Sequence, residues 1–430
     1  MNISNTGKGI LMIAFSILSV FTYSQENTLD LSQAIEKTLA NHYGILISKI
    51  DVEAAETVNT RGNAGGLPTI GFDINSQNSQ RFPDGDPYML NNLTADLGFG
   101  WKIFDGFKVR ITMEKLQELE NFSKGQSAVV IENSIQDVVM NYYYILLLQE
   151  NLEVLEKLMQ LSEDRYEYEK AKFDLGGTVS VNVLLAKNLW LNDRAAFLRQ
   201  EIAVRDAMRT LNFLMAEKDN PFWMLTEDFA FEYKEYSASA LIEKMLSDNQ
   251  VLKNQYLNRQ LKEIDRRIRE TDRLPDLSMS GGVVNSYSRN SSTGSSNTFY
   301  PYLNLSFSYD IYTGGTRETA IKVAELEESI SDIETEEMEH SLTNFMLSIV
   351  DNYELRHDLL EIAEENLQVA EMNLEIANEK YRNGSITSFE YRDIQLIYLY
   401  AAQSRLAAIY ELINIETELT RLTGGFLSVE

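Results

Sequence analysis

The most constraining feature of the sequence is a tandem repeat that runs through most of its 430 residues. Leu67-Pro68 recurs 207 residues later as Leu274-Pro275, and two further motifs recur at an offset of 208. These are Phe104-Asp105-Gly106 with Tyr312-Thr313-Gly314, and Lys172-Phe173-Asp174-Leu175-Gly176 with Lys380-Tyr381-Arg382-Asn383-Gly384. So steady a register indicates a duplication, and any fold of this chain must therefore use one set of elements twice.

Each copy predicts the same series of elements. An amphipathic helix, with Asp30 or Ser237 as its N-cap, ends at Leu-Pro because the residue before a proline avoids the α region. Two β segments separated by a polar loop follow, an aromatic-x-Gly motif opens a long helix, and a glycine turn leads into a returning helix. The predicted ranges are 31–62 and 238–272 for the first helices, 77–92 and 285–297 for the polar loops, 107–173 and 316–381 for the long helices, and 180–216 and 387–423 for the returning helices.

The long helices must pack against other helices, because about 65 residues at about 1.5 Å each extend for about 100 Å. Apolar residues recur along them at helical spacing, and their other faces are acidic and polar. The apolar residues include Ile135, Val138, Tyr142, Ile145 and Leu152 in the first copy, and Leu342, Phe345, Ile349 and Tyr353 in the second.

The N-terminus has the pattern of a secretory signal peptide. Lys8 precedes the apolar run 10–21, and small or polar residues follow up to Ser24, after which cleavage is expected. An uncleaved anchor is the alternative, but the run is shorter than the ~18–20 residues of a spanning helix. The predicted division is a signal peptide at 1–24, a first repeat at 25–216, a small, partly β linker at 217–237 and a second repeat at 238–430.

Composition excludes several classes of function. A net charge of −27 argues against nucleic-acid binding, which needs a basic surface. The chain has no cysteine, so disulfides and thiolate chemistry are excluded. His42, His340 and His357 are isolated in sequence, and the glycine pairs at 281–282 and 314–315 are not part of a phosphate-binding loop. We therefore expect neither an enzyme nor a bound cofactor or metal.

The β segments alternate strictly between apolar and polar residues. In 95–103 every odd position is apolar, and 303–311 repeats the same phase, as do the segments that begin near Ile70 and Leu277. Such alternation fits either a soluble sheet with one buried face or a membrane barrel whose apolar face meets lipid. Three features favour the barrel. The polar face includes charged residues, and the segments are near the ~9–11 residues needed to span a membrane. The aromatic residues Trp101 and Tyr309 occupy equivalent positions in the two copies, as expected at a membrane interface.

Four strands cannot close a barrel, and an open sheet edge is not tolerated in lipid. Several chains must therefore combine their strands. Three chains would supply twelve strands, an allowed even number, although periodicity alone does not determine that three is correct.

Taken together, these motifs resemble those of the TolC-like outer-membrane efflux protein family across the whole mature chain. The resemblance rests on Leu-Pro before each first strand, on the aromatic-x-Gly motifs ending at Gly106 and Gly314, and on the lysine-aromatic-x-x-Gly tips. It implies a mostly α homotrimer in which a twelve-stranded outer-membrane β-barrel continues into a long periplasmic α-helical barrel. It also implies passive export of substrates delivered by an inner-membrane pump, of the RND or ABC type, through a periplasmic adaptor (membrane fusion protein).

The resemblance implies two sites. Acidic residues soon after the second tip, here Glu390 and Asp393, would line a pore constriction, although Arg392 could offset them and Asn182 takes their place in the first repeat. A solvated acidic helix face is the alternative interpretation. The turns at the tips would contact the adaptor, or would be turns and nothing more. They comprise Leu175, Gly176 and Gly177 in the first repeat, and Asn383, Gly384 and Ser385 in the second.

The predicted function is therefore an outer-membrane exit duct, with small-molecule or drug efflux favoured over protein secretion and metal efflux. The alternative is a secreted periplasmic coiled-coil protein with soluble hairpins.

Overall fold

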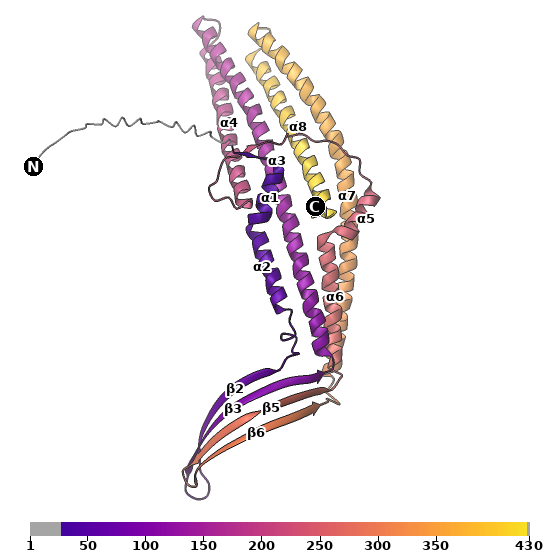
Figure 1. The fold of residues 1–430 in the computed structure, drawn as a ribbon. Coiled ribbons are helices and arrows are strands. Elements are labelled where there is room, and N and C mark those ends of the chain that lie inside the picture. The colour runs from indigo at the N-terminus through magenta and orange to yellow at the C-terminus, as the bar shows by residue number, and fades with distance from the viewer. Residues whose placement is uncertain (1–26, 428–430) are drawn as a thin grey trace, which may run out of the picture.

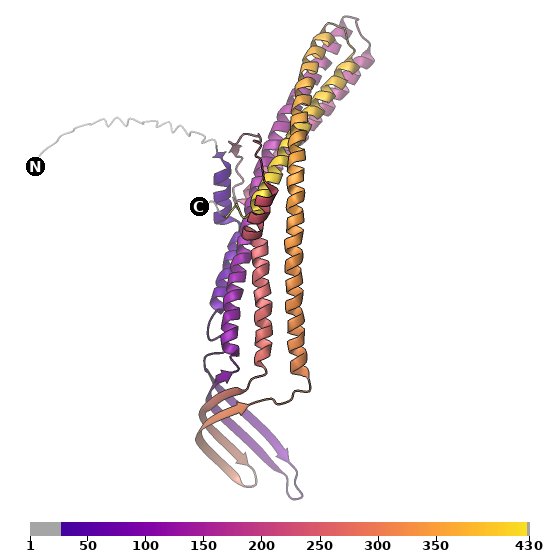
Figure 2. The same cartoon turned by 90° about the vertical axis from the view of Figure 1, so that its right-hand side faces the viewer.

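The computed structural model describes residues 27–427, so the predicted signal peptide at 1–24 lies outside the described residues. The protein is elongated, with a curved four-stranded sheet at one end and two helical hairpins that project to the other end (Figure 1). Figure 2 shows the same arrangement from the side, with the sheet bent away from the axis of the helices. Among the described residues, no helix is both long and apolar enough to cross a membrane.

The same series of elements occurs twice along the chain. The first comprises α1 (Leu31–Asn41), α2 (Tyr43–Val58), β2 (Thr69–Arg81), β3 (Tyr88–Asp105), α3 (Lys108–Asp174) and α4 (Ser180–Leu214). The second comprises α5 (Ala238–Asp248), α6 (Gln250–Thr271), β5 (Asp276–Asn290), β6 (Gly294–Ser308), α7 (Thr316–Arg382) and α8 (Ser388–Leu422). Two short strands, β1 (Thr28–Leu29) and β4 (Met224–Leu225), pair in parallel and attach the segment between the repeats to the start of the chain.

The first helix of each copy is interrupted, which corrects the prediction of single helices over 31–62 and 238–272. His42 and Asn249 adopt extended backbone angles, with ψ values of 127° and 120°. The side chain of Asn249 accepts from the backbone N–H of Leu252 at 2.9 Å and donates to the carbonyl oxygen of Leu422 at 3.1 Å. A local cap and a contact with α8 therefore hold the break in place.

The N-cap of the first helix was predicted correctly. Asp30 caps α1 in a capping box with Gln33. The hydroxyl of Ser237 makes no capping bond to α5 and contacts Ser239 instead.

The strands are longer than their sequences suggest. The polar segments predicted as loops at 77–92 and 285–297 are mostly strand, and the connections shrink to residues 82–87 and 291–293. Cross-strand hydrogen bonds continue through these Ser- and Asn-rich stretches, because pairing outweighs the low β propensity of single residues. At the other end, β6 stops at Ser308, so Tyr309 and Ile311 lie beyond the strand that was predicted to contain them.

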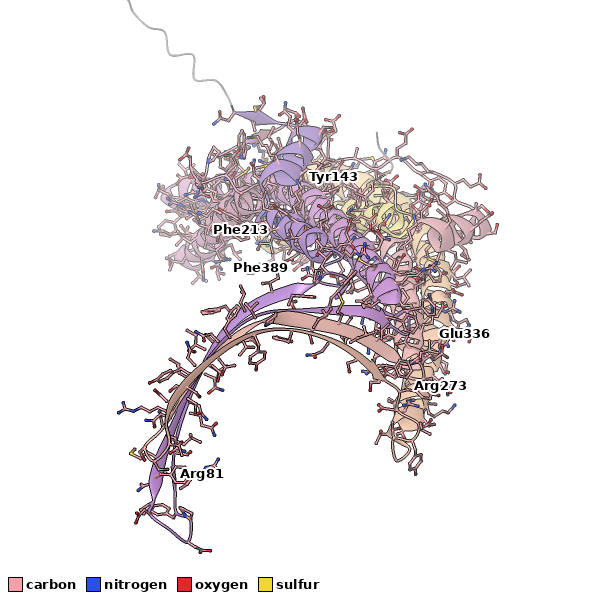
Figure 3. The ribbon with its side chains drawn as sticks, turned by 60° about the horizontal axis from the view of Figure 1, so that its bottom comes forward. Arg81, Tyr143, Phe213, Arg273, Glu336 and Phe389 are labelled. Atoms are coloured by element: carbon pink, nitrogen blue, oxygen red, sulfur yellow. The ribbon has the colours of Figure 1, made fainter. Side chains whose placement is uncertain are left out.

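The sheet is antiparallel with the order β2-β3-β5-β6, so pairing of β3 with β5 joins the two copies. In the centre Gly98 faces Gly282, where a Cβ on Gly282 would lie 2.4 Å from the carbonyl oxygen of Leu97. Apolar residues on one face are strongly exposed, for example Ile70 at 77%. The sheet curves into an open arc, with Arg81 at its far end (Figure 3).

The helices form two long hairpins, α3 with α4 and α7 with α8. The predicted apolar stripe of the first copy is buried, including Ile135, Val138, Tyr142 and Ile145. In the second copy Ile349 and Tyr353 are buried, but Phe345 is exposed. The linker packs on this core through Trp223, Leu225, Phe229, Phe231 and Tyr236.

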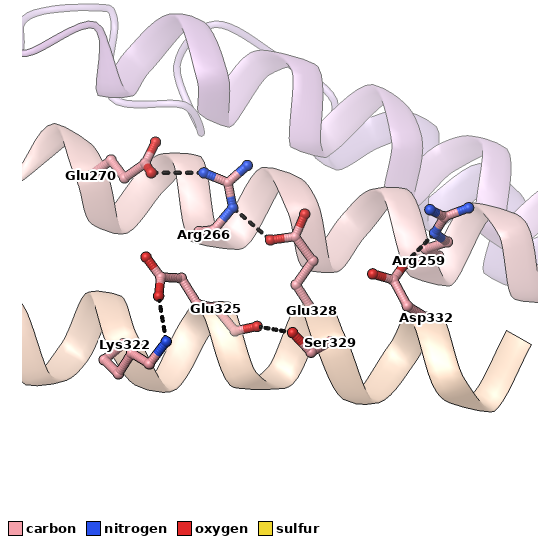
Figure 4. Close-up of polar contacts among 8 residues, drawn as sticks. All are labelled: Arg259, Arg266, Glu270, Lys322, Glu325, Glu328, Ser329 and Asp332. Atoms are coloured by element: carbon pink, nitrogen blue, oxygen red, sulfur yellow. Dashed lines mark hydrogen bonds and ion pairs between the residues drawn. The ribbon is translucent and has the colours of Figure 1, made fainter.

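Near the sheet, ion pairs hold α6 between its neighbours. Arg259 pairs with Asp332 of α7, and Arg266 bridges Glu270 and Glu328 (Figure 4). On the other side Arg267 contacts Glu114 of α3 in a bidentate pair at 2.7 and 2.9 Å. In the sheet-proximal part of the helical wall, ion pairs therefore accompany buried apolar residues such as Ile264 and Ile321.

Candidate pore constriction and helical tips

The two hairpins end in glycine turns at the same end of the molecule (Figure 1). Gly176 and Gly384 have φ values of 76° and 72°, a left-handed conformation that favours glycine. A Cβ at either position would meet no atom within 4 Å, so both turns are open to contact from outside the chain. Leu175 beside the first turn is 88% exposed. Close to the tips, the hydroxyl of Tyr168 donates to the carbonyl oxygen of Arg382 at 3.4 Å and so bridges the hairpins.

Glu390 and Asp393 lie at the start of α8, and both side chains are exposed. Glu390 closes a capping box: its carboxylate accepts from the backbone N–H of Thr387 at 2.7 Å, and Thr387 Oγ1 accepts from the N–H of Glu390 at 3.2 Å. The hydrogen bonds from the backbone and hydroxyl of Thr387 lower the pKa of Glu390 below its ordinary value. Glu390 is therefore a charged residue with a local structural role. Asn182, its first-repeat counterpart, donates to Thr178 at 2.9 Å.

Arg392 does not offset these two carboxylates. Its guanidinium turns inward to Asp193 of α4, with two N–O contacts of 2.7 and 2.8 Å. The side chains are only 12% and 8% exposed, and Ser162 of α3 also donates to Asp193. The pair therefore connects α8 of the second hairpin to both helices of the first.

A second arginine lies beside this pair. Arg165 of α3 is 1% exposed, and its guanidinium nitrogens have no hydrogen-bond partner within the described chain. Burial, followed by repulsion from Arg392, lowers the pKa of Arg165. One helical turn away Glu169 accepts from the hydroxyl of Tyr381 at 2.8 Å, and burial raises the pKa of that phenol. The hairpins thus meet beneath their tips through buried charged and polar groups as well as apolar contacts.

Sequence reasoning missed Asp193, Arg165 and Glu169, yet a signal was present. One helix face, with four-three-four spacing, carries Leu158, Ser162, Arg165 and Glu169, and all four are buried. A charged residue in such a stripe must find a buried partner or remain uncompensated. The spacing marks these positions, but it does not say which helix supplies the partner.

The predicted interfacial aromatics lie at the end of the sheet nearest the helices. Trp101 belongs to β3, and its indole N–H donates to the carbonyl oxygen of Gly66 at 3.3 Å. Tyr309 follows β6 and is about half exposed. Within residues 27–427, no cluster of three or more histidine, aspartate or glutamate residues has the geometry of a metal site.

A four-stranded sheet, two long helical hairpins and the short strands β1 and β4 define a class of proteins, the TolC-like channels. Comparison with solved structures supports this assignment. The Campylobacter jejuni CmeC outer membrane channel matches with a TM-score of 0.76 and 16% identity, covering 99% of this chain and 94% of that one. The Vibrio cholerae outer membrane protein VceC matches with a TM-score of 0.69 and 15% identity, covering 92% and 96%. The open state of the Neisseria gonorrhoeae MtrE channel gives 0.70 and 14%, covering 92% and 89%.

The family follows from the sequence itself. The family model described as outer membrane efflux protein matches residues 34–217 and again 241–425, and the chain belongs to this family. The sequence finds no match among curated proteins. The protein is accordingly an outer-membrane channel whose helical part lies in the periplasm, and its family consists of channels rather than enzymes. Membership in the family favours the channel over the soluble coiled-coil alternative.

Proposed function

We propose that this chain is one subunit of a homotrimeric exit duct, in which three four-stranded sheets close one twelve-stranded barrel. The observation that carries the proposal is that the sheet has two unpaired edges and an exposed apolar face. Within residues 27–427, β2 and β6 each pair on one side only, and the apolar face is exposed. Unpaired edges and exposed apolar residues are both unfavourable in water, whereas closure with other copies pairs the edges and lipid covers the face.

In this assembly the exposed Glu390 and Asp393 of three subunits would form a ring of carboxylates at the periplasmic mouth. Two features support the ring. The pKa of Glu390 is lowered by Thr387, so its carboxylate is charged at neutral pH. Arg392 is engaged with Asp193, so its charge is directed away from the ring. A ring of this kind attracts cations and disfavours anions.

The tips would receive a periplasmic adaptor, which connects the duct to an inner-membrane pump of the RND or ABC type. The exposed turns at Gly176 and Gly384 support this role, because they offer backbone with no side chain in the way. The family model that matches the chain describes outer membrane efflux proteins, which supports efflux as the task of this duct. Protein secretion and metal efflux are the other possible tasks.

Conductance of the purified full-length protein in planar bilayers tests the duct. The wild-type protein is expected to form discrete channels that prefer cations, and Glu390→Gln/Asp393→Asn is expected to lose much of that preference while still forming channels. A matched control, Glu371→Gln/Glu375→Gln, removes two exposed carboxylates from α7 and should leave selectivity unchanged. Absence of any channel refutes the duct, whereas unchanged selectivity in the first variant refutes only the ring.

Docking at the tips needs a separate test. Gly384→Trp should abolish export while the trimer still assembles, because bulk blocks close approach at the turn. Gly384→Asn is the matched control, since asparagine tolerates the left-handed conformation and remains small. Export that persists in the tryptophan variant would contradict docking at this turn.

A further inference from the structure

One exposed or half-exposed arginine lies at each of the four junctions between the sheet and the helices. Arg61 precedes β2, Arg110 follows β3, Arg273 precedes β5 and Arg317 follows β6. Within residues 27–427 none of these four guanidinium groups forms an ion pair, although Glu114 and Glu325 interact electrostatically with Arg110 and Arg273. The guanidinium of Arg317 donates to the backbone oxygen of Asp310 at 2.8 Å. Figure 3 places Arg273 where the helices meet the sheet, at the end of the arc opposite Arg81. We call these four residues the arginine collar.

The layer of the collar contains more cations than carboxylates that form no ion pair, because lysines neutralise two of its carboxylates. Asp272 pairs with Lys108, and Asp265 with Lys115. Asp105 caps α3 by accepting from the backbone N–H of Val109. Within residues 27–427, the carboxylates of this layer that form no ion pair are Asp105, Asp276, Asp310 and Glu318, whereas the cations that form none are the four collar arginines, Lys102 and Arg269. A local cationic excess is notable in a chain with a net charge of −27.

Aromatic side chains lie in the same layer as the collar, between the sheet and the helices. Arg61 packs on Gly66, where a Cβ would lie 2.9 Å from its Cγ, and the carbonyl oxygen of Gly66 accepts the indole N–H of Trp101. Phe107 at the start of α3 and Tyr312 beyond β6 are also exposed, the latter at 84%. Aromatic rings with basic side chains beside them are the pattern of a membrane–water interface.

We propose that the arginine collar binds the phosphate headgroups of anionic phospholipids in the periplasmic leaflet of the outer membrane. Each guanidinium can donate two parallel hydrogen bonds to a phosphate, a geometry that lysine does not provide. The contact sets the depth of the barrel in the bilayer, and every chain of the assembly adds four such arginines. The inference rests on the proposed position of Trp101 at the periplasmic interface.

Quenching of Trp101 by brominated lipid tests the proposal on the full-length protein. The chain has three tryptophans, so Trp190→Phe/Trp223→Phe leaves Trp101 as the only one. The protein is reconstituted into vesicles that mix ordinary phosphatidylcholine with dibromo-phosphatidylglycerol or with dibromo-phosphatidylcholine. Phosphatidylglycerol is expected to be preferred around Trp101 by about fivefold, the effect of about 1 kcal/mol from one basic contact near a membrane surface.

Substitution of the collar supplies the decisive comparison. Arg61→Gln/Arg110→Gln/Arg273→Gln/Arg317→Gln should reduce the preference to about one, while the four arginine-to-lysine replacements should retain part of it. The matched control replaces Arg199, Arg205, Arg209 and Arg356 of the hairpins with glutamine and should keep the full preference. If the quadruple glutamine variant does not assemble, Arg61→Gln/Arg273→Gln changes two loop positions only and should lower the preference by at least half.

Equal quenching by the two brominated lipids in the parent protein, or an unchanged preference in the glutamine variants, would overturn the collar. Absence of quenching by either lipid would overturn the position of Trp101 and the collar with it. Conductance measured on the same preparations tests the duct independently, so a functional channel without lipid preference separates the two proposals.

Discussion

Removal of Asp193 should release the second hairpin from the first beneath the tips. In the parent chain two hydrogen bonds of 2.7 and 2.8 Å join Asp193 to Arg392, and both side chains are nearly buried. Asp193→Ala leaves Arg392 without its carboxylate, beside Arg165, which is buried and already has no partner. Loss of one member of a buried pair costs about 3–5 kcal/mol, mostly from the uncompensated charge that remains.

The loss should appear as faster local opening. At about 1.4 kcal/mol per factor of ten, opening at the start of α8 should become about 100- to 4,000-fold more frequent. Hydrogen exchange of the detergent-solubilised full-length protein, read by mass spectrometry on a peptide that spans residues 388–400, measures this directly. The far end of α8 should exchange as in the parent, because its Leu419 and Leu422 pack in a separate apolar cluster with Met346.

Two further variants make the test specific. Asp206→Ala removes an exposed carboxylate from the same helix, whose partner Arg209 is also exposed, and should change nothing measurable. Asp193→Leu/Arg392→Met replaces the pair with apolar side chains and should recover most of the protection. Exchange at parental rates in Asp193→Ala, or equally fast exchange in the single and double variants, would refute the role assigned to the pair.

Three other predictions concern separate parts of the molecule. Burial raises the pKa of Glu132 from 4.5 to about 7, so the folded chain retains a proton that the unfolded chain releases, and stability falls as pH rises between these values. Glu132→Gln should therefore raise the thermal unfolding midpoint at pH 8, where it removes a penalty of about 3 kcal/mol, and have little effect at pH 4. Gly282→Val should prevent assembly on a native gel, because its Cβ would overlap the carbonyl oxygen of Leu97. Thr387→Ala should cost about 1 kcal/mol in denaturant titration and move the pKa of Glu390 back toward its ordinary value in NMR titration, since both effects come from the capping box.

Some features of the fold could be predicted because they depend on local patterns. The long helices begin and end within a residue or two of the predicted positions, since aromatic-x-Gly and the glycine tips break helical periodicity at defined points. Strand extent could not be predicted in this way. The polar residues of 77–81 and 285–290 become strand because a neighbouring strand supplies their hydrogen-bond partners, and a polar stretch does not reveal that neighbour.

The same distinction between local and long-range features applies to the candidate sites. Gly176 and Gly384 were recognisable because a left-handed turn favours glycine, and the structure places both at the tips. Glu390 was recognisable from the sequence as an acidic residue that follows the second tip. Its role in capping α8 became visible only from the hydrogen bonds between Thr387 and Glu390 in the structure. The direction of Arg392 was not predictable, because its partner lies 199 residues away on another helix.

The sequence by itself determined the duplication and the order of elements, because periodicity and glycine positions are local properties. Tertiary structure alone decided which charges meet. Which helices and strands become neighbours decides whether a charged side chain finds a partner. It decides the pairing of Asp193 with Arg392 and the absence of a hydrogen-bond partner for Arg165 within residues 27–427. It also decides the position of the four collar arginines. Electrostatic energies vary with distance and burial, and a linear sequence specifies neither for residues far apart along the chain.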